Sequence, residues 1–302
     1  LTGLVLAGLP AVAMTYLSEE VESTALASAM GLYISGTALG GMSGRLLSAW
    51  AAESWGSAGA ALTVGLCGLL AAIGFLLCLP ASRQFHARLL PLTRAGRQAW
   101  RSSLLQLLRD PALRALWAMG FVFLGCFVGF YNFIGFRLER PPFSWGSLAI
   151  GSVFLLYLFG GAASAASGRI MRRWGFLPAL QVMWLTLIAG VLCTLSSSLV
   201  LLLTGMALFT LAFFAGHALA SSAVGLRSQG HQAMAAAIYL CCYYAGASAF
   251  GPLLGWVWHD QQWSAVVVAL VAAGFIGLWL TSRLGTTGIL LYACAAFLKG
   301  SP

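Results

Sequence analysis

Residues 199–223 read LVLLLTGMALFTLAFFAGHALASSA, a run that contains no Asp, Glu, Lys or Arg. A helix needs about 20 consecutive, mainly apolar residues to cross the hydrocarbon layer of a bilayer. This run is long enough to cross the layer as a single helix, and it has no charged side chain that would need to be hydrated. The stretch therefore predicts a transmembrane helix, and with it an all-α membrane protein.

The composition of the whole chain supports this interpretation. Of its 302 residues, 60% are hydrophobic and 8% are charged, and the mean hydropathy is +0.90. Because about a quarter of the residues in a soluble domain are charged, lipid has to be the main solvent of this chain. The 36 glycines fit the same class, since small residues let membrane helices approach closely.

Similar apolar runs recur along the chain, separated by charges and turn residues. One longer segment, 81–111, is rich in arginine and predicts a partly helical cytoplasmic linker. Three apolar runs precede this linker and six follow it. The nine predicted spans are 1–17, 25–47, 58–80, 112–136, 143–167, 176–195, 199–223, 233–258 and 263–282.

The positive charges predict the orientation of these spans, because Lys and Arg gather in cytoplasmic loops. With 81–111 in the cytoplasm, all but three of the 16 Lys and Arg residues fall on that side; the exceptions are Arg45, Arg137 and Arg140. We expect a multi-pass protein of the bacterial inner membrane, with its first residue outside and its C-terminus in the cytoplasm. Topology thus accounts for the net charge of +9 without a nucleic-acid partner.

The reactive residue types exclude several function classes. The seven cysteines are odd in number and lack C-x-x-C spacing, so we expect no disulfide framework, metal site or cofactor. An enzyme embedded in the membrane needs paired carboxylates, a Ser/His/Asp set or a metal cluster, and only one histidine lies at membrane depth. The chain is therefore not expected to be an enzyme. A channel or sensor remains as a weaker alternative, because no filter or charged ring is visible.

Two spans on opposite sides of the linker share a pattern of aromatic and small residues. A constant offset of 211 residues relates Tyr33 to Tyr244 and Gly40 to Gly251. Repeated halves around a central binding site are typical of secondary transporters. The alternative is independent use of glycine in two membrane helices.

Over residues 1–283 the chain resembles the major facilitator superfamily. Residues 31–45, GLYISGTALGGMSGR, are similar to the glycine-rich fifth-helix motif of proton-driven antiporters, with Gly36-Thr37 where a Gly-Pro often stands. Residues 168–175, GRIMRRWG, are similar to the second copy of the cytoplasmic loop motif, with Arg172 in place of the usual acid. Further segments, 213–222 and 243–248, resemble the arabinose-efflux-permease-like branch.

The resemblance implies a fold of twelve transmembrane helices in two bundles, of which nine helices are present. Its domains would be half of an N-terminal bundle at 1–80, the linker at 81–111, a six-helix C-terminal bundle at 112–283 and a tail at 284–302. Since 1–17 corresponds to the fourth helix, we expect an N-terminally truncated chain.

The implied function is secondary active transport by a monomer in the lipid bilayer. Proton-coupled antiport would drive efflux of a small molecule such as a drug, sugar or metabolite by alternating access. The alternative is an inactive fragment of such a transporter, because three helices and any coupling acid on them would be missing.

His217 is the only ionisable residue well inside a predicted span, and such residues are usually functional. Because histidine titrates near neutral pH, His217 is a candidate for proton coupling and substrate binding. The alternative is a neutral imidazole that hydrogen-bonds between helices.

Further substrate-binding candidates are polar or aromatic residues at membrane depth. Tyr131 and Asn132 lie in the span that the resemblance identifies as the seventh helix, which commonly lines the pocket; hydrogen bonding between helices is the alternative. Of Tyr243 and Tyr244 we prefer Tyr244, because it has the repeat partner Tyr33.

The remaining candidates concern helix packing and gating. Small residues four positions apart form a flat stripe on a helix, and such a seam would govern which side opens. The basic loop residues are mainly topology determinants with a possible gating role, and Arg45 is expected to snorkel to the outer surface. The set is Gly36, Gly40, Gly41, Gly44, Gly251, Gly255, Arg169, Arg172 and Arg173.

Overall fold

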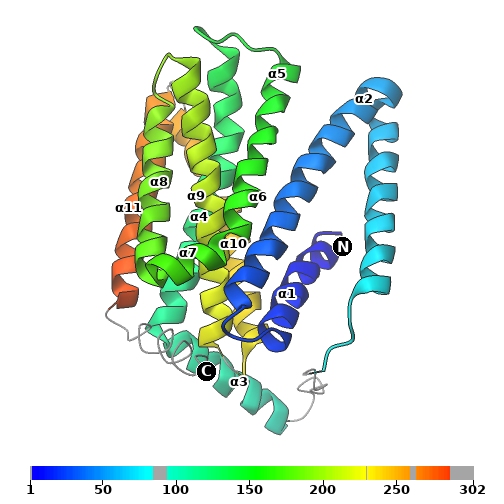
Figure 1. Ribbon diagram of the computed structural model, residues 1–302, viewed down its shortest axis with the longest axis vertical. Helices are drawn as coiled ribbons and strands as arrows, with labels where there is room; N and C mark the ends of the chain where they lie inside the picture. The colour runs from blue at the N-terminus through cyan, green and yellow to red at the C-terminus, as the bar shows by residue number, and fades with distance from the viewer. Residues whose placement is uncertain (1, 84–93, 229, 259–262, 286–302) are drawn as a thin grey trace.

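A computed structural model describes residues 2–83, 94–228, 230–258 and 263–285, and these residues contain helices and no strand. The predicted tail therefore lies almost wholly outside the described residues, as does part of the linker. The elements, drawn in Figure 1, are α1 (Thr2–Glu20), α2 (Leu26–Cys78), α3 (Arg94–Arg109), α4 (Pro111–Glu139), α5 (Ser147–Ser152), η1 (Val153–Leu156), α6 (Tyr157–Ala165), α7 (Ser167–Trp174), α8 (Phe176–Cys193), α9 (Leu199–Arg227), α10 (Gln232–Val257) and α11 (Trp263–Gly285).

The predicted spans coincide with helices, although their count is not confirmed. Six helices are long and apolar enough to cross a membrane, and a seventh span results if the bent pair Ala149–Ala165 and Ser167–Trp174 is counted as one. The other two predicted spans, 1–17 and 25–47, fall in α1 and in the first part of α2. Nine spans therefore remain a prediction.

The α2 helix reverses direction where the sequence predicted a loop between two spans. Gly56 has φ 70° and ψ −173° and interrupts the helical backbone. Only glycine adopts this conformation readily, because a Cβ would clash with the backbone. The helix therefore continues to Gly56, turns there, and returns along a second arm that ends at Cys78 (Figure 1).

The predicted span 143–167 is broken rather than continuous. A 3₁₀ segment, η1, separates α5 from α6, and α7 is bent by 47° from the preceding helix. Short 3₁₀ stretches inside a helix often mark hinges, since their hydrogen-bond geometry is poorer. This break lies directly before Tyr157, a residue of the site described below.

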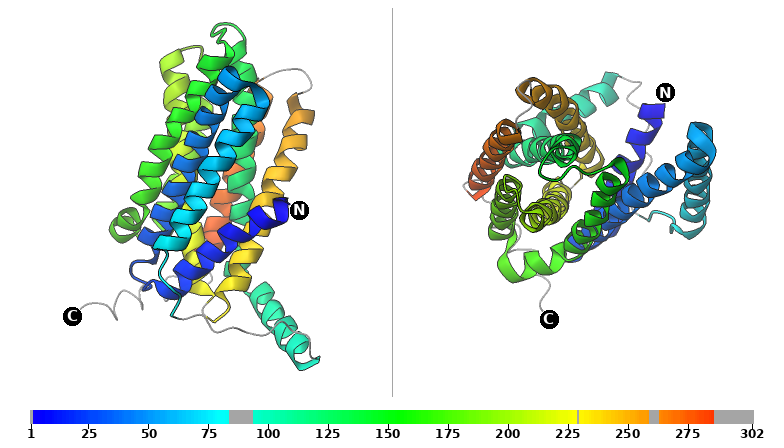
Figure 2. Two further views of the ribbon diagram at one scale, coloured as in Figure 1. Left: turned by 90° about the vertical axis from the view of Figure 1, so that its right-hand side faces the viewer. Right: turned by 90° about the horizontal axis from the view of Figure 1, so that it is seen from above.

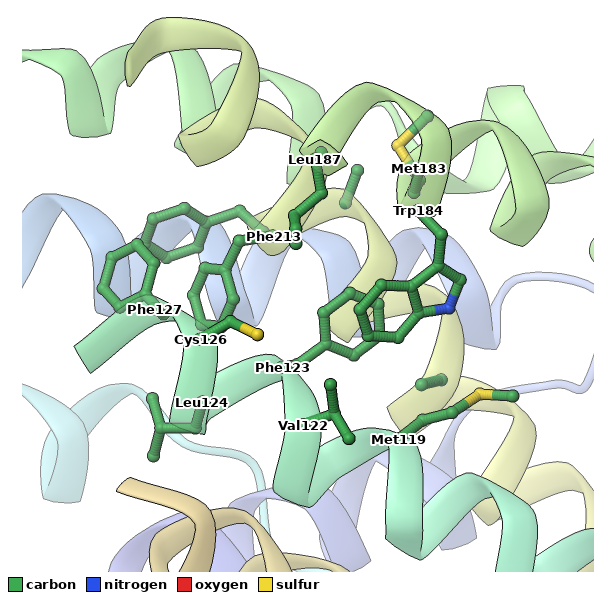
Figure 3. Close-up of a cluster of buried hydrophobic side chains, with 14 of the residues drawn as sticks. Met119, Val122, Phe123, Leu124, Cys126, Phe127, Met183, Trp184, Leu187 and Phe213 are labelled. Atoms are coloured by element: carbon green, nitrogen blue, oxygen red, sulfur yellow. The ribbon is translucent and has the colours of Figure 1, made fainter. Parts of the chain in front are cut away.

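The core lies among α4, α8, α9, α10 and α11, which pack side by side (Figure 2). Figure 3 shows its aromatic centre, where the ring of Phe123 stacks on Trp184 with centroids 3.9 Å apart. Phe127 stacks on Phe213 at the same separation. Each buried aromatic side chain contributes a large apolar area, so these pairs hold α4 against α8 and α9.

The helices before the linker lie along one side of this bundle (Figure 2). The α1 helix contacts α10 and α9, whereas α2 contacts α6, α7 and α9. After the linker helix α3, Asp110 begins α4. One of its carboxylate oxygens accepts hydrogen bonds from the backbone N–H groups of Ala112 and Leu113, and the other pairs with Nε of Arg227 at 2.8 Å.

Candidate functional site

His217 lies in the middle of a stack of aromatic rings contributed by α9 and α10. Its side chain is 6% exposed. The Nδ1 atom lies 2.7 Å from the hydroxyl oxygen of Tyr239, and the imidazole stacks on Tyr243 with centroids 4.5 Å apart. Phe213 lies on the same stack, 6.1 Å from the imidazole. The bond from His217 on α9 to Tyr239 on α10 is a hydrogen bond between helices, which was the alternative to a role of His217 in transport. That role in transport stays a prediction.

The repeat partners Tyr33 and Tyr244 lie on α2 and α10, which come from opposite sides of the linker. Tyr33 and Tyr243 both pack against the hydrophobic core. The Tyr244 ring meets Tyr243 edge-on at 5.5 Å and is 43% exposed. Tyr243 is the tyrosine of this pair that stacks on His217, and the preference for Tyr244 as a substrate-binding residue stays a prediction.

Tyr131 and Asn132, adjacent in the sequence, occupy different surroundings. The Tyr131 hydroxyl lies 2.7 Å from Oγ1 of Thr210. Because the Thr210 hydroxyl donates its one proton to the Met206 carbonyl, Tyr131 is the donor in this hydrogen bond. Asn132 is exposed and forms no hydrogen bond to the residues that the structure describes. Its predicted role in lining a pocket stays a prediction.

Arg45 lies beside two aromatic rings that come from the other side of the linker. Its guanidinium carbon lies 4.7 Å from the ring centroid of Phe154 and 5.6 Å from that of Tyr157. Since α2 runs on to Gly56, Arg45 stands eleven residues before the reversal, about 16 Å along the helix. The sequence did not indicate these ring contacts; the side chain is exposed, and snorkelling to the outer surface stays a prediction.

The glycines predicted to pack helices occupy other positions. A Cβ at Gly36, Gly40, Gly44 or Gly251 would meet no atom within 4 Å, and one at Gly255 would meet only the edge of Phe133. Among the described residues, Gly36, Gly40, Gly44 and Gly251 thus have open space where a packed helix would stand, and their packing role stays a prediction. Gly41 differs, because the Arg45 side chain lies 3.6 Å from the place of its missing Cβ.

The close contact between α2 and the α6–α7 segment uses the other face of α2. Ser164 donates to the carbonyl of Gly31 at 2.9 Å, and Ser167 donates to that of Ala27 at 3.1 Å. A Cβ at Gly31 would overlap the backbone carbonyl of Ser164. This contact therefore lies on a stripe of small residues other than the predicted one, since both faces of α2 carry small residues.

Of the three loop arginines, one touches α2. Arg172 donates to the Ser28 hydroxyl at 3.4 Å. Arg169 and Arg173 are exposed and make no polar contact within the described ranges. A gating role therefore has a structural counterpart only at Arg172, and it stays a prediction.

Comparisons with known proteins now bear on this geometry. Residues 1–252 match the family model described as Major Facilitator Superfamily. The chain belongs to the major facilitator superfamily. This assignment confirms the resemblance seen in residues 31–45 and 168–175 and supports membrane transport as the activity.

Two bacterial relatives of this superfamily member cover nearly all of it. It is 39% identical over 282 residues to an uncharacterized MFS-type transporter, YybF, of Bacillus subtilis (strain 168), which covers 93% of this chain and 69% of the relative. It is also 39% identical over 291 residues to the inner membrane transport protein YnfM of Escherichia coli (strain K12), covering 94% and 68%.

A solved structure confirms the fold. The human organic anion transporter MFSD10 (TETRAN) matches with a TM-score of 0.68 at 22% identity, over 89% of this chain and 66% of that one. The match confirms an all-α membrane fold of the major facilitator type. The superfamily chain thus spans about two thirds of the length of the proteins that it resembles.

Proposed function

We propose that the protein is a secondary transporter that exports a small organic molecule by alternating access, with the proton as coupling ion. The observation that carries this proposal is that Tyr33 from α2 and Tyr243 from α10, which stacks on His217, pack against the same hydrophobic core. Helices from both sides of the linker supply these groups, as a site between two moving bundles requires.

The proposed organisation follows the linker. Residues 1–80 would belong to the N-terminal bundle and 112–283 to the C-terminal bundle, joined by the cytoplasmic segment 81–111. The α3 and α7 helices, with their arginines, lie at one end of the molecule, and the α2 reversal lies at the other (Figure 1). This arrangement supports an inner-membrane protein with its arginine-rich end in the cytoplasm, as does the name of the Escherichia coli relative. A monomer is sufficient for this mechanism.

His217 is the group that we propose to carry the proton. Among the described residues, no Asp or Glu lies in the middle of a predicted span, so His217 is the ionisable group nearest the convergence of the halves. The groups that face it are Tyr239 and Tyr243 from α10 and Phe213 from its own helix. Protonation would make both ring nitrogens donors, so that the Tyr239 hydroxyl accepts from Nδ1 and Nε2 can donate to a second group.

Inside-out membrane vesicles provide the test of transport. Respiration acidifies the vesicle lumen, and a quenched acridine dye reports the pH gradient. A panel of drugs, sugars and metabolites is added in turn. We expect at least one compound to restore dye fluorescence in vesicles that contain the protein and to have less effect on vesicles without it. If no compound separates the two vesicle types, proton-coupled transport of these classes is contradicted.

The role of His217 is tested with the compound that this screen identifies. His217→Ala should abolish the pH dependence of its transport, whereas substitution of the half-buried His231, which precedes α10, should leave that dependence intact. Unchanged transport by His217→Ala at every pH would refute proton coupling through this residue.

A further inference from the structure

We propose that Arg45, Tyr157 and Phe154 form a subsite for the anionic group of an organic anion with an aromatic body, an inference that rests on the transport function proposed above. The three residues come from both sides of the linker, since Arg45 lies on α2 whereas Phe154 lies on η1 and Tyr157 begins α6. The subsite therefore spans the same division as the tyrosines beside His217.

The first argument concerns the charge of Arg45. No carboxylate of the described residues lies within 4 Å of its guanidinium group, and the side chain is exposed. An arginine at membrane depth is costly and usually faces the bundle interior or a water-filled passage. Because no described residue supplies an acidic partner, the positive charge is available to an anion from solution.

The second argument concerns the hydroxyl group of Tyr157. Its side chain is 3% exposed, and its oxygen atom is buried without a hydrogen-bond partner among the described residues. An unsatisfied buried hydroxyl is costly, and the neighbouring tyrosine, Tyr131, already donates to Thr210. Among the described residues the O–H of Tyr157 is thus an unpaired donor, on a ring whose centroid lies 5.6 Å from the Arg45 guanidinium carbon. An anionic oxygen between the two groups would satisfy both.

The third argument concerns the apolar surroundings. The rings of Phe154 and Tyr157 are 5.5 Å apart and meet edge to face, and Tyr131 lies 5.6 Å from Phe154 and 5.3 Å from Tyr157. Arg45 already stacks over two of these rings. A ligand with an aromatic body could pack on the same rings while its carboxylate meets the guanidinium group, whose planar fork matches a carboxylate.

The position of Gly41 adds a steric condition. Two atoms lie near the place where a Cβ at Gly41 would be: Nη1 of Arg45 at 3.6 Å and a ring carbon of Tyr157 at 4.0 Å. The absence of a side chain there leaves room for the guanidinium group to fold back towards Tyr157. Part of the glycine stripe of α2 thus serves this subsite.

Binding to the protein in lipid nanodiscs tests the proposal independently of transport. The probes are 2-naphthoate, its neutral counterpart 2-naphthamide, and the cation 2-naphthylmethylammonium, which share one ring system and differ in charge. We expect naphthoate to bind at least about tenfold more tightly than naphthamide, as one charge-assisted hydrogen bond allows, and the cation to bind most weakly.

Variants then assign that preference to residues. Arg45→Gln should abolish the preference for naphthoate, and Arg45→Lys should retain part of it because the charge remains. Tyr157→Phe should weaken naphthoate binding about threefold to tenfold by removing one donor. Arg137→Gln is the matched control and should keep the full preference. The guanidinium carbon of Arg137 lies 5.1 Å from the ring centroid of Phe143, which is not part of this subsite.

Equal affinity of the unmodified protein for naphthoate and naphthamide would overturn the proposal, as would no binding of any probe up to millimolar concentration. An Arg45→Gln variant that keeps the preference would overturn it as well. These failures differ from a failure of the transport proposal. If only neutral compounds cause the protein to dissipate the proton gradient, the result contradicts the anion subsite and not the transport function. If naphthoate binds through Arg45 but no compound is transported, the result contradicts the transport function and not the subsite.

Discussion

At the scale of single residues, the Tyr239 hydroxyl provides the only hydrogen bond that the described structure shows for the buried His217 ring. Tyr239 itself is fully buried. Tyr239→Phe should lower the free energy of unfolding by about 1 kcal/mol, because it leaves a ring nitrogen unsatisfied. Unfolding of the purified protein in mixed micelles by increasing SDS measures this change.

Tyr243→Phe is the control for this prediction. The Tyr243 ring stacks on His217, and its hydroxyl makes no hydrogen bond to the described residues. The variant keeps the stacking and should change stability by a smaller amount. Equal losses in both variants would mean that the Tyr239–His217 bond contributes nothing specific.

The residues of the candidate site were only partly predictable. His217 stands out in the sequence because it lies well inside an apolar run that contains no Asp, Glu, Lys or Arg. Tyr239 precedes Tyr243 by four residues, a spacing that places both on one helix face, so the signal for their shared contact was present. The place of Arg45 depends on where α2 ends, and hydropathy does not determine a helix end that lies in a polar turn.

At the scale of elements, the reversal of α2 depends on Gly56. Its φ of 70° and ψ of −173° are available essentially to glycine alone, and another residue costs about 1–3 kcal/mol there. Gly56→Ala should therefore lower the unfolding free energy of the protein in mixed micelles by that amount.

Gly36→Ala is the matched control for Gly56→Ala, because Gly36 is helical and has open space around it. Alanine favours helix over glycine by up to about 1 kcal/mol, so this variant should be neutral or stabilising. A loss of stability at Gly36 as large as that at Gly56 would contradict the conformational explanation.

The seam between α2 and α6 gives a second prediction for an element. Gly31→Ala places a Cβ against the Ser164 carbonyl, which is backbone and cannot rotate away. We expect a loss of about 1–3 kcal/mol in unfolding free energy. Gly40→Ala, on the stripe that the sequence favoured, meets no atom and should lose little. A larger loss of unfolding free energy for Gly40→Ala than for Gly31→Ala would contradict this and would favour the predicted stripe as the packing surface.

The positions of the helices followed from apolar run length, but their internal breaks did not. Residues 143–167 contain no charged residue, so run length alone predicted one continuous span. The pair Gly151-Ser152 directly precedes the 3₁₀ segment at Val153–Leu156; Gly/Ser pairs are typical of helix breaks, but hydropathy does not register them. The two stripes of α2 are similarly ambiguous, since both contain small residues.

At the scale of the whole molecule, the proposed site between α2 and α10 predicts that a cross-link between positions 33 and 244 blocks transport. The native cysteines are first replaced by alanine, because Cys241 and Cys242 lie next to this region. Tyr33→Cys and Tyr244→Cys are then introduced together and joined with a bifunctional thiol reagent of disulfide type. Transport in vesicles should stop, because alternating access requires the two halves to separate at one side, and a reducing agent should restore it.

Each single cysteine variant, treated with the same reagent, is the control for simple blockage by the added group. Activity that persists in the cross-linked double variant would show that these two positions stay together throughout the transport cycle. The tyrosines would then belong to a fixed contact.

A single residue, Asp110, stands between α3 and α4, and its side chain is engaged by the start of α4 and by the end of α9. Because the connection is one residue long, a tilt of the arginine-rich α3, caused by a lipid headgroup or a bound protein, would also tilt α4. Tyr131 lies on α4, so a binding event at one face of the membrane would displace a residue in the interior of the helix bundle.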